Sequence, residues 1–192
     1  MKLEALNDGT AVIVRPLTMA DLDRVHRYFC SLPAEDRRYL RFDVAKRQIV
    51  EWLIREAEAG RAYRCVAVVN DEIVGHGALE ITADGWHRHI GEIRALVLQD
   101  YRGRGMGALL FAHLFHAAER RGVQKVVIKM AGPQITARKA CERLGFSVDA
   151  VLPDHVKDSD GNLHPLVVMS IGLDEVSKAM RDFYKDDDWP DG

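Results

Sequence analysis

Residues 89–122 join an apolar segment, a glycine-rich turn and a helical pattern without interruption. The segment "HIGEIRALVL" is typical of a strand whose apolar end is buried on both faces. It leads into "QDYRGRGMG", and "MGALLFAHLFHAAERRG" continues with apolar side chains at helical spacing. Glycines ahead of a helix allow successive backbone N–H groups to point outward together, where the helix dipole also favours an anion. The unit therefore predicts an anion-binding turn between a central strand and a helix. A tight turn with solvated arginines is the alternative.

Strand and helix patterns lie on both sides of this unit. The first strand, "AVIVRPL", precedes a helix from an N-cap at Thr18 to about Cys30, and Gly60 ends a second helix over "KRQIVEWLIREAEAG". A hairpin of "YRCVAVV" and "IVGHGALEI" precedes the central strand. The chain continues with the strand "VQKVVIKM", the helix "QITARKACERL" and two strands, "SVDAVLPDHVK" and "HPLVVMSI". The predicted order is β-α-α-β-β-β-α-β-α-β-β, an α/β (α+β) fold in which helices cover a mixed sheet.

The length of 192 residues is that of one domain, predicted over residues 1–174, with a C-terminal helix and acidic tail at 175–192. A formal net charge of -2 argues against general nucleic-acid or membrane-surface partners, which prefer a basic excess. No stretch reaches the ~20 apolar residues that cross a bilayer, and the N-terminus shows no secretory signal pattern. The three cysteines are odd in number and far apart, which favours a reducing, cytoplasmic location over a disulfide framework.

The glycine spacing is compatible with more than one anionic ligand. "GRGMGA" satisfies the dinucleotide fingerprint through Gly103, Gly105 and Ala108. The following strand, however, carries Lys129 in the region where that fingerprint needs an acidic residue. A Walker loop would need Gly-Lys-Ser/Thr, which does not follow. Nicotinamide and ATP sites are therefore disfavoured.

The segment "LVLQDYRGRGMGALL" resembles the acetyl-coenzyme A (acetyl-CoA) loop of the GNAT N-acetyltransferases, whose pattern is Arg/Gln-x-x-Gly-x-Gly/Ala. Arg102, Gly105 and Gly107 occupy its fixed positions. The order of elements resembles that family's fold over residues 10–172, and "QITARKACERLGF" resembles its helix before the sixth strand. "RYLRF" and "GEIRALVLQDYRGRGMG" are most similar to the protein-lysine acetyltransferase (Pat-like) branch. The resemblance implies a mixed, mostly antiparallel sheet of six or seven strands flanked by helices.

The resemblance also implies acetyl-CoA as cosubstrate. In this family the fourth strand separates from the fifth, which leaves a slot for the pantetheine arm. A pyrophosphate would lie on the amides of residues 103–108, and one N–H near the thioester oxygen would stabilise developing negative charge by ~3–4 kcal/mol. The residues that the resemblance assigns to the cofactor are Leu96, Val97, Leu98, Arg102, Gly103, Arg104, Gly105, Met106, Gly107, Ala108 and Gln134.

Glu92 is the predicted general base, because it aligns with a glutamate that has this role in the protein-lysine branch. A lysine amine with a pKa of ~10.4 is protonated at neutral pH and must lose a proton, directly or through water, before it attacks. Strand alternation predicts that Glu92, Arg94 and Leu96 share one face of the sheet. The alternative is a surface ion pair between Glu92 and Arg94 that contributes little.

Cys141 stands four residues before Gly145, where many family members have a tyrosine that protonates the departing thiolate. A thiol with a pKa of ~8.5 could donate this proton, or it could be a small buried apolar side chain. The predicted function is acetyl transfer from acetyl-CoA to a primary amine, of a protein lysine or a small molecule, in a ternary complex. The alternative is a non-catalytic acyl-CoA-binding or sensing module, to which the missing tyrosine lends some weight.

The acceptor site is expected among the two N-terminal helices, the connection "SLPAEDRRYLRF" and the last hairpin. Glu35 and Asp36 could attract a cationic acceptor or be solvated. A homodimer is a candidate state because dimers are common in the family. No metal site is predicted, since His87 and His89 have no third ligand at a recognisable spacing.

Overall fold

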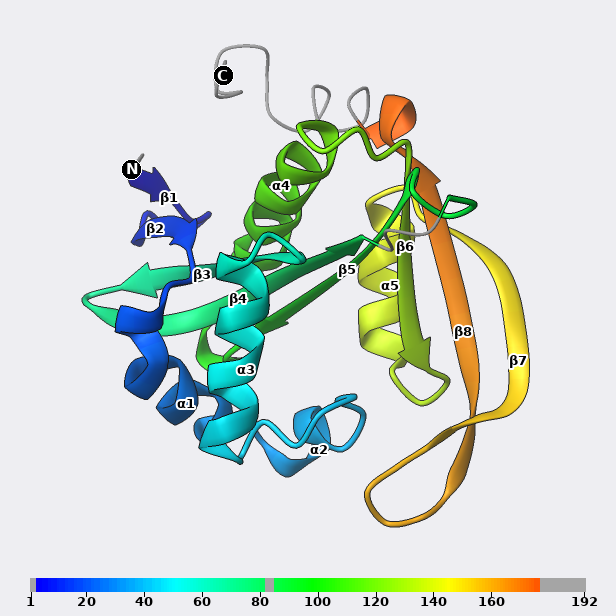
Figure 1. Ribbon diagram of the computed structural model, residues 1–192, viewed down its shortest axis with the longest axis horizontal. Coiled ribbons are helices and arrows are strands. Elements are labelled where there is room, and N and C mark those ends of the chain that lie inside the picture. Colours follow the sequence, from blue (N-terminus) through cyan, green and yellow to red (C-terminus); the bar gives the residue numbers. More distant parts are fainter. Residues whose placement is uncertain (1–2, 82–84, 177–192) are drawn as a thin grey trace.

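The computed structural model describes residues 3–81 and 85–176 of the chain (Figure 1). Within these ranges one sheet contains the strands β1 (Leu3–Ala5), β2 (Ala11–Pro16), β3 (Ala62–Val69), β4 (Glu72–Ile81), β5 (Ile90–Val97), β6 (Lys125–Ala131), β7 (Ser147–Lys157) and β8 (Leu163–Gly172). The helices are α1 (Leu22–Ser31), α2 (Ala34–Arg37), α3 (Arg47–Glu58), α4 (Met106–Glu119) and α5 (Ile135–Arg143), with 3-10 turns η1 (Met19–Asp21) and η2 (Gln99–Tyr101). No helix in the described ranges has the length and apolar character to cross a membrane. The segment predicted as a C-terminal helix and tail, 175–192, falls almost wholly outside the described residues.

The predicted order of elements is confirmed, with two short additions. β1 pairs antiparallel with β2, so the described sheet has eight strands where the resemblance implied six or seven. α2 lies inside the connection that was expected to be irregular. These elements are three and four residues long, too short for a strand or helix period to appear in the sequence.

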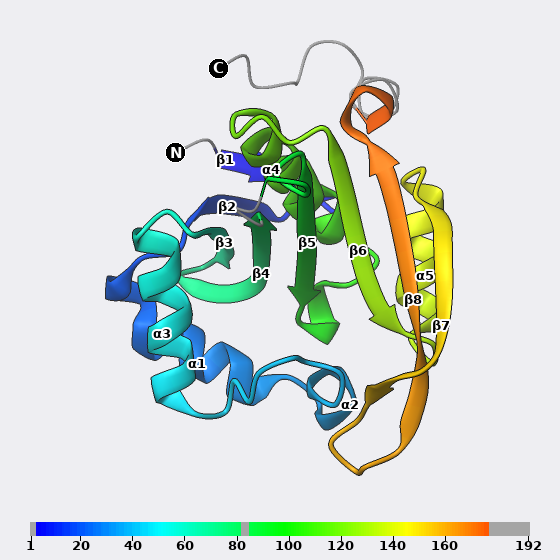
Figure 2. The ribbon, with the colours of Figure 1, turned by 45° about the vertical axis from the view of Figure 1, so that its right-hand side comes forward.

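The strand order is β1-β2-β3-β4-β5-β6-β8-β7. All neighbouring pairs are antiparallel except β5 and β6, which run parallel because α4 connects them. The sheet is therefore mixed and mostly antiparallel. Figure 2 shows β5 and β6 side by side where they begin and separated at their arrowheads.

Helices cover both faces of the sheet. α1 and α3 pack on one face, where Val25 and Ile54 are fully buried. α4 and α5 pack on the other face, where Leu110, Leu114 and Cys141 belong to a second hydrophobic core.

The predicted cap, Thr18, precedes the 3-10 turn η1, whereas the N-cap of α1 itself is Asp21. The Thr18 N–H and hydroxyl donate to the Asp21 carboxylate at 3.2 and 3.1 Å. Arg15 donates two further bonds to Asp21, and hydrogen bonding to Arg15 is the main reason that the pKa of Asp21 lies below its ordinary value. Thr18 caps η1, which precedes α1, so the regular helix begins at Leu22.

Candidate functional site

The parallel pairing between β5 and β6 is short. Residues 90–92 of β5 pair with residues 125–127 of β6, and the pairing stops there. β5 continues along β4 as far as Val97, whereas β6 continues along β8 as far as Ala131. The two strands separate after Glu92 (Figure 2), as the resemblance implied. The region between them, where β5 and β6 are no longer paired, is the opening.

The main chain of β5 presents some of its polar groups to this opening. In an antiparallel ladder, successive residues alternate between bonding to the partner strand and pointing away from it. The Leu98 N–H donates to the Val74 carbonyl at 2.9 Å, so the polar groups of Leu96 also face β4 and those of Val97 face the opening. The Leu96 carbonyl also accepts from the Tyr28 hydroxyl at 2.8 Å. Of the three residues assigned to the cofactor arm, Val97 is the one whose N–H points to the opening.

Two glycines shape the turn between β5 and α4. Gly103 and Gly105 have φ values of 73° and 91°, a left-handed conformation that side chains with a Cβ adopt at a cost. Gly105 is the N-cap of α4, and a Cβ on it would stand 2.8 Å from Asn7 Oδ1. The Asn7 N–H donates to the Arg104 carbonyl at 3.0 Å, so the segment after β1 supports the turn.

The amides at the start of α4 fit an anionic group. Among the described residues, none accepts a hydrogen bond from the N–H groups of Met106, Gly107 or Ala108. A Cβ at Gly103 or Gly107 would meet no atom within 4 Å, so a ligand can approach the backbone at both positions. Unpartnered N–H groups at the positive end of a 14-residue helix favour phosphate. The turn can therefore hold the pyrophosphate of acetyl-CoA.

Both arginines of the turn bind acidic residues of the protein. Arg102 donates through Nε to the Val97 carbonyl at 2.9 Å and pairs with Asp36 of α2. Arg104 pairs with Asp8 at 3.0 Å. Each arginine side chain is nevertheless almost half exposed, so a contact with phosphate stays a prediction. Asp36 fixes the turn and is not free to attract a cationic acceptor.

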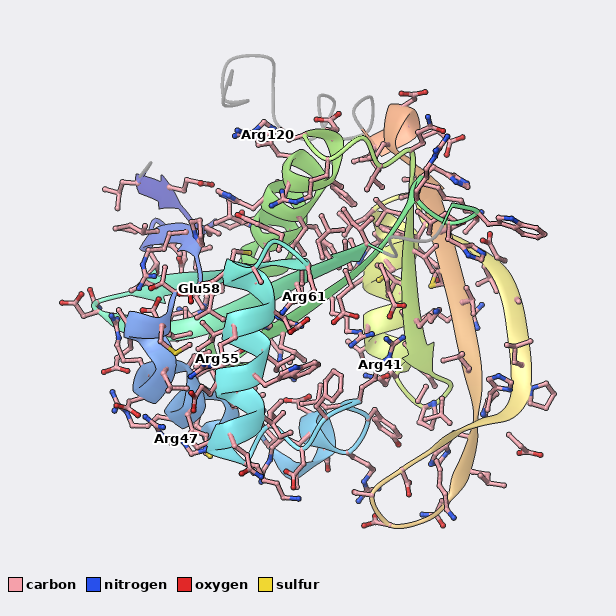
Figure 3. The ribbon with its side chains drawn as sticks, in the orientation of Figure 1. Arg41, Arg47, Arg55, Glu58, Arg61 and Arg120 are labelled. Carbon is pink, nitrogen blue, oxygen red and sulfur yellow. The ribbon has the colours of Figure 1, made fainter. Side chains whose placement is uncertain are left out.

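Glu92 stands where β5 and β6 separate, and three basic side chains surround it. Its Oε1 accepts from Arg94 at 2.5 Å and from Arg41 at 2.6 Å, and its Oε2 lies 3.0 Å from Lys129 Nζ. Figure 3 labels Arg41 on the side of the molecule where β6 and α5 lie. Burial alone would raise the pKa of Glu92, but the hydrogen bonds and charges of the three basic neighbours outweigh it and lower that pKa. Glu92 is therefore a carboxylate at neutral pH.

Glu80 of β4 lies directly opposite Glu92 in the sheet. It pairs with Arg64 at 3.1 Å and lies 3.6 and 3.7 Å from the guanidinium groups of Arg41 and Arg94. Four basic and two acidic side chains together form an ionic floor: Arg41, Arg64, Glu80, Glu92, Arg94 and Lys129.

The pairing of β4 with β5 is regular over residues 75–81 and 91–97. Because no bulge interrupts it, the predicted placement of Glu92, Arg94 and Leu96 on one face is confirmed. The two charged residues belong to the network of the ionic floor, so they are more than an isolated surface pair.

Cys141 and Gln134 both lie on the face of α4 and α5. Cys141 is 4% exposed within the hydrophobic core, and burial raises the pKa of its thiol to about 11. This environment favours packing over proton donation. Gln134 is the N-cap of α5, and its Oε1 accepts from the Ala131 N–H at 2.9 Å, which holds the side chain at the end of β6.

Arg41, Tyr28 and Lys129 are parts of the site that sequence reasoning missed. Arg41 reaches Glu92 across 51 positions, and Tyr28 reaches Leu96 across 68. Local spacing carries no information on such contacts. Lys129 did leave a signal in the sequence, because it is the one charged residue in the apolar run from 126 to 131.

Comparisons with known proteins identify the family of this chain. The sequence model of the Acetyltransferase (GNAT) family matches residues 26–146. A curated protein of Pseudomonas aeruginosa, Acetyltransferase PA5475, is 27% identical over 157 residues, which are 75% of this chain and 79% of that protein.

Solved structures share the fold. The GNAT domain of S. lividans PAT has a TM-score of 0.72 and 19% identity, over 89% of this chain and 96% of that chain. The structure of yncA from Salmonella typhimurium with its cofactor acetyl-CoA has a TM-score of 0.67 and 20% identity, over 85% of this chain and 95% of that chain. The family match spans α3, the separation of β5 from β6, the glycine turn and α5. The chain therefore belongs to the GNAT family and is an acyl-CoA-dependent N-acetyltransferase.

Proposed function

We propose that the protein transfers the acetyl group of acetyl-CoA directly to a primary amine, of a protein lysine or a small molecule, in a ternary complex. The observation that carries the proposal is the ionised Glu92 carboxylate at the point where β5 and β6 separate. Acetyl-CoA, held by the amides of residues 103–108, would supply the activated acetyl group. The Val97 N–H, which points to the opening, is the donor that we assign to the thioester oxygen.

Glu92 is proposed as the general base. The acceptor ammonium must lose a proton, and Glu92 is ionised, 14% exposed and next to the opening. Its three basic neighbours make it a weak base, so transfer through water to solvent is favoured over retention of the proton. Cys141 is left out of this mechanism because its thiol is buried in the core of α4 and α5. A cytoplasmic location is part of the proposal and is supported by three free thiols.

Glu92→Gln tests the proposal. We expect turnover to fall by ~10²-fold or more, because the amide cannot accept the proton. The affinity for acetyl-CoA should not change, because the glycine turn is unaltered. Release of CoA against a panel of amines measures turnover, and calorimetry measures binding.

The matched control is Glu51→Gln, which removes a carboxylate that pairs with Arg55 on α3. It should have wild-type turnover. An unchanged rate in Glu92→Gln would remove Glu92 from the mechanism. Tight binding of acetyl-CoA by the wild type, without turnover of any amine, would favour the acyl-CoA-binding module instead.

A further inference from the structure

A cleft of about 460 Å³ opens beside the ionic floor. Its walls come from residues 34–45, which include α2 and the segment after it, and from residues 157–159 at the turn between β7 and β8. Arg41 lines the cleft and also donates to Glu92, so one side chain connects the cleft with the proposed base. A volume of this size suits a small molecule.

The charged residues of the cleft are predominantly basic. Four basic side chains line it, and its two acidic residues already have partners: Asp43 pairs with Lys46, and Asp158 pairs with His164. Asp158 also accepts from the backbone N–H groups of residues 160 and 162, so its carboxylate serves the turn. Arg38 and Arg41 pair with Asp160 and Glu92, outside the cleft lining. Among the described residues, the basic side chains of the cleft without an acidic partner are therefore Arg37 and Lys157.

Arg37 has a buried donor without a partner. Its Nε is inaccessible to solvent, and no residue in the described ranges accepts a bond from it. The remaining guanidinium nitrogens of Arg37 and the Lys157 ammonium also lack an acidic partner in that part of the chain. The buried Nε cannot contact a molecule in the cleft, so a carboxylate there would accept from the terminal guanidinium nitrogens of Arg37. The planar guanidinium fork matches a carboxylate, which can accept two parallel bonds.

The ionic floor, which shares Arg41 with the cleft, has four basic and two acidic side chains. Arg64, at 6% exposure, also has a buried Nε with no partner among the described residues. An acceptor with several positive charges would be repelled along this route. In an acceptor with one amine and one carboxylate, the carboxylate would bind Arg37 and the amine would be directed toward Glu92.

We infer that the acceptor is a small aminocarboxylate, an amino acid or a close analogue, whose carboxylate binds Arg37 and Lys157 in the cleft while its amine is directed past Arg41 to Glu92. This inference rests on the proposed function and narrows its acceptor class. The apolar side chains of Leu40 and Phe42 in the cleft wall would contact the carbon skeleton.

The test compares matched acceptors, leucine against leucinamide and 6-aminohexanoate against its amide. Release of CoA gives kcat/KM for each compound. We expect at least one free carboxylate to be preferred over its amide by ~10-fold or more, as for a charge-assisted bond. In Arg37→Gln the ratio of kcat/KM for the carboxylate to kcat/KM for its amide should fall toward one, mainly because KM for the carboxylate rises. Arg55→Gln, which removes an exposed arginine of α3 (Figure 3), should keep the wild-type ratio.

Binding provides a readout that does not depend on turnover. In the presence of CoA, the two carboxylates should raise the melting temperature of the wild type more than their amides do, and Arg37→Gln should abolish the difference. Equal use of the amides, or preference for lysine peptides or polyamines, would overturn this inference and leave the proposed function standing. Carboxylate binding through Arg37 without turnover of any amine would overturn the proposed function and leave the aminocarboxylate site. If the wild type binds neither carboxylate and acetylates no amine, both the inference and the proposed function are overturned.

Discussion

Glu92 is an acid whose neighbours hold it ionised and thereby limit its strength as a base. Each of the three basic side chains favours the carboxylate form, so the form required for catalysis is present above a pKa that lies below the ordinary value for glutamic acid. Glu80 is the other acid that faces Glu92. His76, further along the same face of β4, is neutral at neutral pH because burial lowers its pKa to about 3. Single residues therefore set how the site responds to pH.

Lys129→Met should move the acidic limb of the rate profile to higher pH. The substitution removes the ammonium that lies 3.0 Å from Glu92 Oε2, so the pKa of Glu92 should rise. As the pH falls, the variant loses the ionised base before the wild type does. The measurement is the ratio of kcat/KM for variant and wild type between pH 4 and 8, because the ionisation of the acceptor cancels in this ratio.

Lys125→Met is the control, since Lys125 lies on the same strand and pairs with Asp149. Its ratio to the wild type should not change with pH. A ratio for Lys129→Met that is equally flat would show that Glu92 does not titrate as the base.

At the scale of elements, the turn before α4 contains glycines with different physical functions. Gly105 is required by the backbone, because its φ is 91° and Asn7 leaves no space for a Cβ. Gly107 lies inside the first turn of α4, where a Cβ would meet open space. One glycine fixes the path of the chain, whereas the other leaves its amide accessible.

Gly105→Ala and Gly107→Ala should therefore change stability in opposite directions. Gly105→Ala should destabilise the protein by about 1–2 kcal/mol and weaken acetyl-CoA binding, since the turn must shift. Gly107→Ala should stabilise α4 by about 0.5–1 kcal/mol, as alanine suits a helix, and weaken acetyl-CoA binding, because the Cβ would occupy the space by which the ligand approaches the backbone. Denaturant titration measures stability and calorimetry measures binding. Wild-type acetyl-CoA affinity in both variants would place the pyrophosphate elsewhere.

The helices and strands that define the site could be predicted from the sequence because each is long enough to show a period and ends at a recognisable residue. The helix after the glycine turn and the stop at Gly60 are examples. α2 could not be predicted, since a single turn has no period. The basic side chains around Glu92 could not be predicted either. Arg41 belongs to the connection after α2, and only the tertiary fold brings it to Glu92, so no local sequence pattern indicates the contact.

At the scale of the whole molecule, the sheet consists of two parts joined by a narrow contact. Strands β1 to β5 form one part and β6, β8 and β7 the other, and only three pairs of residues join β5 to β6 within the described sheet. α4 connects the parts along one face. A ligand between β5 and β6 would bridge the two parts of the sheet.

Acetyl-CoA should accordingly slow amide hydrogen exchange in β5 and in the turn that leads into α4. We expect protection at residues 93–98 and 103–109, where the main chain of β5 and the start of α4 would contact the ligand. α3 should show no change, because it packs on the face of the sheet opposite to α4, in a separate hydrophobic core. Mass spectrometry of peptic fragments measures the effect. Protection confined to segments outside the opening and the turn would refute this location.

The opening between β5 and β6 results from the courses of two backbones, each held by a different neighbouring strand. Substitutions along either strand would alter its lining without closing it. Residues 34–45 and the turn at residues 158–162, in contrast, belong to no strand of the sheet. These segments could change during evolution, and the acceptor would change with them, while the site for acetyl-CoA between β5 and β6 is retained.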